Sequence, residues 1–178
     1  SNCKFEGGHT HLLGVEGESS VRAVDCTFDD SAQAAIVVTG HSSLDLVRCS
    51  VNRGGIAAVG AARCFLLDSR FCAEPLGADM QSQLAVFSAV ADTQIAQCEF
   101  VSVSGHALHL SDCAAAAIDH TRLVGGNGSA LVATSQVAGN SLTIQRSELG
   151  TRHGAFTLQL HGGCAALTGC VASGGTTS

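Results

Sequence analysis

The tripeptide Cys26-Thr27-Phe28 returns along the chain as Cys49-Ser50-Val51 and Cys98-Glu99-Phe100: a small residue, any residue, then an apolar one. Eight copies of this pattern begin at Cys3, Cys26, Cys49, Ser69, Cys98, Thr121, Ser147 and Cys170. Successive copies therefore start 23, 23, 20, 29, 23, 26 and 23 positions apart. A repeat of this length cannot bury its own apolar face and has to stack on its neighbours, which predicts a solenoid.

Two further apolar pairs accompany each copy. Around the second copy they are Val21 and Ala23 upstream, and Ile36 and Val38 downstream. Each pair has the period-2 spacing of a short strand with one face inward. The upstream pair is out of phase with the tripeptide because three residues separate them, so the chain has to bend there. The spacing of these residues therefore predicts three short strands and three corners in each repeat.

These features predict an all-β fold, a right-handed parallel β-helix of about seven coils of ~23 residues with three short strands per coil. A helical assignment is disfavoured, because no sustained helical stripe of apolar residues occurs and 21 glycines are spread through the repeats. We expect residues 1–178 to form a single domain. Since no capping helix precedes Cys3 or follows Cys170, we also expect this domain to be a fragment of a longer protein or to pair end to end with another copy.

Cysteine placement bears on the cellular compartment. Five of the nine cysteines begin copies of the tripeptide, in a column where Ser and Thr substitute for them. This substitution pattern indicates small residues at a tight corner rather than disulfides, and no Cys-x-x-Cys spacing indicates a zinc site. Free thiols are typical of a reducing environment, so we expect an intracellular, cytoplasmic protein.

Composition excludes several function classes. The formal net charge is −6 and the nine Lys and Arg residues do not cluster, which argues against nucleic acid as a partner. No apolar stretch approaches the length of a membrane span. The eight histidines have no Cys or acidic partner at ligand spacing, and no catalytic or cofactor-binding motif occurs. We therefore expect no enzymatic activity, cofactor or metal.

Two regions are candidates for binding. The first is the outward side of the downstream strands, which is poor in charge for a surface that only meets solvent. We place Val37, Ala57, Ala85, His109 and Val132 on this interaction face. The second is the longest corner, 72–83, because insertions in solenoids tend to lie on the functional face. Its candidate residues are Glu74, Pro75, Asp79 and Met80.

The Cys-x-Phe pattern, the apolar pair about ten residues later and the ~23-residue period resemble the parallel β-helix repeat family, from Cys3 to Ala172. That family includes pectate-lyase-like enzymes, phage tailspikes and intracellular interaction domains such as the nessun dorma-like cytokinesis proteins. The charged residues that pectate-lyase-like members present on one sheet have no matching positions here. The resemblance therefore implies the non-catalytic, interaction-domain branch.

The leading hypothesis is a non-enzymatic protein-interaction or scaffold module within a larger intracellular protein, whose partner is another protein or a second copy of itself. The alternative is a carbohydrate-binding or polysaccharide-cleaving β-helix protein. Glycan binding is disfavoured because the chain has no Trp and no Tyr to form aromatic platforms.

Overall fold

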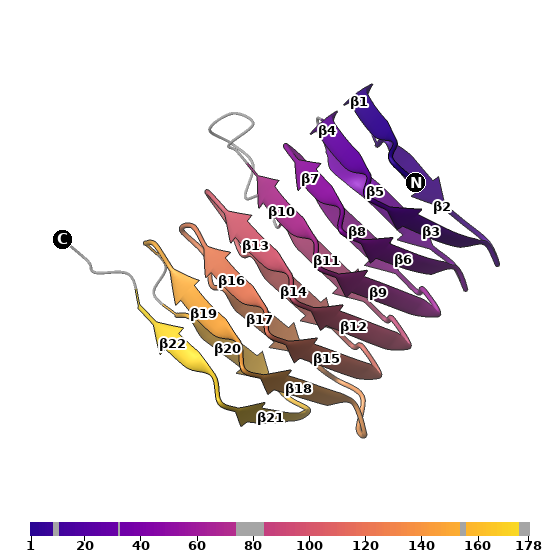
Figure 1. Cartoon of the computed structure of the whole chain (residues 1–178). Helices are drawn as coiled ribbons and strands as arrows, with labels where there is room; N and C mark the ends of the chain where they lie inside the picture. The colour runs from indigo at the N-terminus through magenta and orange to yellow at the C-terminus, as the bar shows by residue number, and fades with distance from the viewer. Residues whose placement is uncertain (9–10, 32, 74–83, 154–155, 175–178) are drawn as a thin grey trace.

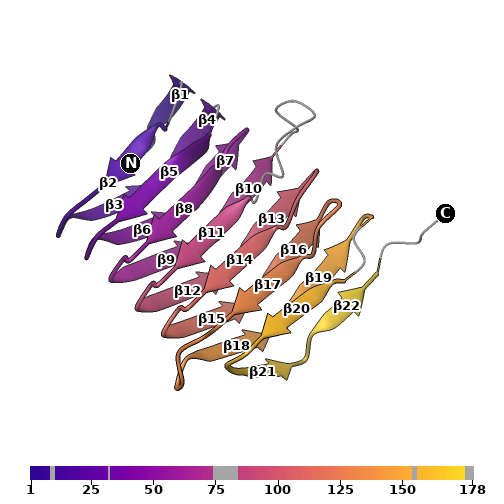
Figure 2. The same cartoon turned by 180° about the vertical axis from the view of Figure 1, so that it is seen from behind.

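The computed structural model describes residues 1–8, 11–31, 33–73, 84–153 and 156–174. These residues form 22 β-strands and no helix. The strands stack into a rod with three parallel sheets, to which each turn contributes one strand per sheet (Figure 1, Figure 2). The prediction of an all-β parallel solenoid of about seven turns is confirmed.

We name the sheets A, B and C in the order in which each turn visits them. Sheet A has eight strands: β1 (Lys4–Gly8), β4 (Thr27–Ser31), β7 (Ser50–Asn52), β10 (Arg70–Ala73), β13 (Glu99–Ser102), β16 (Arg122–Gly125), β19 (Glu148–Thr151) and β22 (Val171–Ser173). Sheet B has seven: β2 (Leu13–Val15), β5 (Ala34–Thr39), β8 (Gly55–Val59), β11 (Ala85–Ser88), β14 (Leu108–Ser111), β17 (Leu131–Thr134) and β20 (Leu158–His161). Sheet C has seven: β3 (Ser20–Val24), β6 (Ser43–Val47), β9 (Arg63–Leu67), β12 (Asp92–Ala96), β15 (Ala115–Asp119), β18 (Ser141–Gln145) and β21 (Cys164–Thr168).

The bend predicted before each tripeptide is a single residue in the left-handed conformation. Its φ lies between 46° and 62° in all eight copies. The residues are Asn2, Asp25, Arg48, Asp68, Gln97, His120, Arg146 and Gly169. Seven of the eight are not glycine, although this conformation is unfavourable for a residue with a Cβ. The stacked coils above and below therefore hold the bend in place.

The small-residue column is also a hydrogen-bonded ladder. Ser69 Oγ donates to the carbonyl of Leu67 at 2.9 Å and accepts the N–H of Cys49, in the preceding coil, at 3.0 Å. Thr121 and Ser147 repeat this arrangement with the coils before them. The column therefore selects side chains that are small and can also satisfy a buried N–H.

Inward columns fill the centre of the rod. Phe71 stacks on Phe100 with ring centroids 4.5 Å apart, and both rings are fully buried. Phe5 stacks on Phe28 in the same way at 4.8 Å. Since each ring lies one rung from the next, the core is continuous along the rod axis.

Two coils differ from the predicted register. In the fourth coil the inward pair is Ala85 and Phe87, one residue later than expected, because Leu84–Phe87 is an uninterrupted apolar run that fits either phase. In the seventh coil the repeat spacing favours Phe156 and Leu158 as the inward pair, but the strand starts at Leu158, so Leu158 and Leu160 continue the inward column. The first error follows the longest corner, and the second follows a corner one residue longer than those before β14 and β17. Spacing does not fix the register after a corner of unusual length.

Candidate protein-interaction face

The outward side of sheet B forms one continuous column along the rod. In neighbouring strands Val37 lies beside Ala57, Ala57 beside Val86, Val86 beside His109, and His109 beside Val132. Val37, Ala57, Val86 and His109 are half-buried, whereas Val132 is only 7% exposed. Four of the five predicted face residues therefore share this column.

Ala85 does not belong to the face. It is fully buried and pairs with Ile56 and Leu108, so its side chain lies in the inward column. Val86 lies on the face instead, because the apolar run Leu84–Phe87 fits either phase of a strand. The candidate loop residues Glu74, Pro75, Asp79 and Met80 lie outside the described residues.

Sequence reasoning also missed Val59, which is 51% exposed at the end of β8 on the same side of sheet B. It lies two positions after Ala57 and shares its phase. Strand periodicity alone could have found it. We define the sheet-B face as Val37, Ala57, Val59, Val86, His109 and Val132.

Sheet B is set apart by its lack of formal charge. Its seven strands contain no Asp, Glu, Lys or Arg, whereas sheets A and C both carry such residues on their outward sides. The ion pairs found among the described residues lie on sheets A and C and at the corners. They include a ladder of alternating charge on the outward side of sheet A, in which Arg70, Glu99, Arg122 and Glu148 join at 3.1, 2.7 and 3.4 Å.

Asp25 and Asp30, which lie close together in the sequence, also form ion pairs. Arg48 holds Asp25 through two hydrogen bonds of 2.6 and 2.8 Å, and this contact lowers the pKa of Asp25. Asp30 pairs with Arg53 at 3.1 Å. Each of these carboxylates therefore forms an ion pair with an arginine of the next coil.

A hydrogen-bonded polar group lies at the A–B corner, beside sheet B. His106 Nδ1 accepts the N–H of Ser129 at 2.8 Å, and Gln159 Nε2 donates to Ser129 Oγ at 2.9 Å. Because Nδ1 of His106 accepts this N–H, the ring proton is on Nε2. Nε2 is therefore not available to accept a proton from the hydroxyl of Ser129. Burial, and secondarily His106, lower the pKa of His109, so the centre of the face is neutral at pH 7.

All nine cysteines are free thiols. Burial raises the pKa of Cys64 and of Cys98 to about 12. Within the described ranges, no group of three or more His, Cys, Asp and Glu side chains could hold a metal ion. The same residues include no helix long and apolar enough to cross a membrane.

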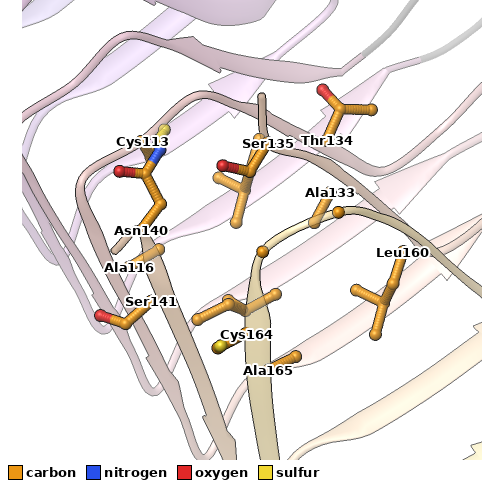
Figure 3. A pocket seen from close by; sticks show the side chains of 14 residues that line it. Cys113, Ala116, Ala133, Thr134, Ser135, Asn140, Ser141, Leu160, Cys164 and Ala165 are labelled. Atoms are coloured by element: carbon orange, nitrogen blue, oxygen red, sulfur yellow. The ribbon is translucent and has the colours of Figure 1, made fainter. Parts of the chain in front are cut away.

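A small cavity opens near the C-terminal end, between sheets B and C (Figure 3). Cys113, Ser135, Asn140, Leu160 and Cys164 contribute to its lining, and Asn140 Nδ2 is buried there without a hydrogen-bond partner among the described residues. Its volume of about 30 Å³ is far below the ~300–1,000 Å³ of small-molecule sites. The cavity has room for water rather than for a ligand.

Comparison of this chain with protein-family models, with curated proteins and with solved structures gives no match.

Proposed function

We propose that this chain is a non-enzymatic protein-interaction or scaffold module, and that the sheet-B face binds a partner protein through a flat, uncharged, apolar surface. The observation that carries the proposal is the absence of Asp, Glu, Lys and Arg from all seven strands of sheet B. Interface cores are depleted in charged residues in the same way.

The chemistry of the face supports a protein rather than a charged polymer. Nucleic acid and acidic polysaccharides are bound through cationic side chains or cations held by carboxylates, and sheet B offers neither. Half-buried Val37 and Val86, together with exposed Val59, favour a partner whose own contact surface is apolar.

We place the module in the non-catalytic branch of parallel β-helix repeat proteins, of which the nessun dorma-like interaction domains are the nearest analogy. An intracellular, cytoplasmic location is part of the proposal and is supported by the nine free thiols. The remaining function class, a carbohydrate-binding or polysaccharide-cleaving protein, becomes an outcome of the tests.

The test uses charged substitutions on two sheets. Val59→Asp and Val86→Asp place a carboxylate on the sheet-B face, whereas Ala117→Asp places one on exposed, outward sheet C. Val132 is unsuitable because its burial would make an Asp costly to folding. A partner is isolated with the wild-type chain and purified, and its affinity is measured for all four chains.

Support requires at least about tenfold weaker binding for both face variants, unchanged binding for Ala117→Asp and little dependence on salt, since no ion pair is involved. Equal affinity for all four chains would exclude this face. If the wild-type chain binds or cleaves a glycan and the face variants do not, the carbohydrate alternative replaces the proposal. A wild-type chain that retains no protein at all would also overturn it.

A further inference from the structure

The corner between β16 and β17 contains the dipeptide Asn127-Gly128. Asn127 is exposed, whereas the two glycines before it are buried. Asparagine is a thermolabile residue, because the next backbone nitrogen along the chain can attack its side-chain amide. A glycine in the next position leaves that nitrogen without the shielding of a side chain and lets the backbone rotate more freely.

The stacking of this corner on the preceding coil requires glycine. A Cβ on Gly128 would lie 2.7 Å from the main-chain carbon of Gly105 and from both N and Nδ1 of His106. A Cβ on Gly126 would overlap the carbonyl oxygen of Val103. The close contact between coils therefore selects the residue type that also makes the Asn-Gly link reactive.

Hydrogen bonds hold the corner on both sides of this link. The N–H of Gly126 donates to a carbonyl of the preceding coil at 3.0 Å, and the N–H of Ser129 donates to His106 Nδ1 at 2.8 Å. In contrast, the N–H of Gly128 and the side chain of Asn127 have no hydrogen-bond partner among the described residues. The attacking nitrogen and the amide that it attacks are both available.

We propose that Asn127 is a site of spontaneous deamidation in the folded chain, through a succinimide. The nitrogen of Gly128 attacks Cγ of Asn127, and the new Cγ–N bond replaces the Cγ–Nδ2 bond. Nδ2 leaves as ammonia with the proton of the Gly128 N–H. One water molecule then opens the ring, at Cγ to give aspartate or at the main-chain carbonyl to give isoaspartate, so no oxidant or cofactor is required.

The anchored corner favours aspartate over isoaspartate. Isoaspartate lengthens the backbone by one atom, whereas aspartate leaves its path unchanged. The carbonyl of Gly126 accepts the N–H of His153 at 3.0 Å, and the N–H of Ser129 is held by His106. An additional backbone atom between Gly126 and Ser129 would strain these bonds on either side of it.

Deamidation places a new carboxylate on the A–B corner. It adds one negative charge to the formal net charge of −6, and the corner leads directly into β17 of the uncharged sheet. The edge of sheet B would therefore change its charge slowly and irreversibly as the protein ages.

The first experiment follows deamidation of the folded chain at about pH 8 by peptide mass spectrometry. Asn52 and Asn140 are internal controls, since neither is followed by glycine. Asn127 should react at least about tenfold faster than either control, and within roughly tenfold of a synthetic peptide of residues 121–133. Persistence of Asn127 in the folded chain, while the peptide reacts, would show that the corner protects it and would overturn the proposal.

A second experiment separates the two products. Asn127→Asp supplies the reference for the aspartate form in ion-exchange chromatography, and aged wild type should develop a peak at the same position. The isoaspartate share should be at least about twofold lower in the folded chain than in the peptide, and His106→Ala should raise it by removing the acceptor of the Ser129 N–H.

Equal isoaspartate shares in wild type and peptide would show that the corner opens before it reacts, and would refute deamidation in the folded chain. This comparison does not depend on His106→Ala, so it decides the question even if that variant unfolds. Neither experiment requires a partner, so the outcome is independent of partner binding at the sheet-B face.

Discussion

At the scale of single residues, the tripeptide column combines a steric and a polar requirement. The sequence indicates smallness, because Cys, Ser and Thr alternate at one position. The structure adds that the hydroxyl side chains Ser69, Thr121 and Ser147 each bridge two coils through hydrogen bonds. A substitution pattern in one sequence cannot reveal this second role, since a buried N–H in the neighbouring coil has no sequence signature.

The bridge made by Ser69 gives a first prediction. Ser69→Ala should lower the free energy of unfolding by about 1–3 kcal/mol, because the buried N–H of Cys49 loses its acceptor. Ser69→Cys keeps a small acceptor and should cost less. The measurement is urea unfolding, with Ser20→Ala as the exposed control. A Ser69→Ala chain as stable as the control would show that the hydroxyl only fills space.

Buried thiols predict a loss of stability at alkaline pH. The pKa of Cys64 and of Cys98 is about 12 in the folded chain, against an ordinary value of 9.0. Between pH 9 and 12 the unfolded chain therefore releases protons that the folded chain retains, so the free energy of unfolding falls as pH rises. Cys98→Ser should make this fall shallower, and Ser is already accepted at equivalent positions. An identical pH profile for the variant would contradict the assignment.

At the scale of strands, the sequence predicts register wherever corners keep their usual length. The inward pairs of sheet C and the tripeptides of sheet A stack as their spacing indicates. The prediction failed for Ala85 because a four-residue apolar run follows the longest corner, and alternation cannot select its phase. The sequence predicts that the outward side of sheet B is poor in charge. That its strands contain no Asp, Glu, Lys or Arg at all is clear only once the strand bounds are known.

The ion-pair ladder on sheet A gives a prediction at this scale. Glu99 contacts both Arg70 and Arg122, whereas Glu148 contacts Arg122 alone among the described residues. Each such pair contributes roughly 0.2–1 kcal/mol, so Glu99→Gln should destabilise the fold about twice as much as Glu148→Gln. Thermal unfolding at low and high salt checks this, because salt should reduce both losses. Losses that do not change with salt would show that packing, rather than charge, holds these side chains.

At the scale of the whole molecule, stability is expected to vary along the rod. A solenoid turn is held by its two neighbours, and the last turn has only one. Strands β20, β21 and β22 are largely exposed, whereas the core of the central turns contains the fully buried side chains of Phe71, Phe87 and Phe100. Local opening should therefore begin at β22 and move inward.

Amide hydrogen exchange tests this gradient. In dilute protein, amides of β20–β22 should exchange faster than those of β11–β13, since fewer contacts hold the last turn. Equal exchange rates in β20–β22 and in β11–β13 would contradict this gradient.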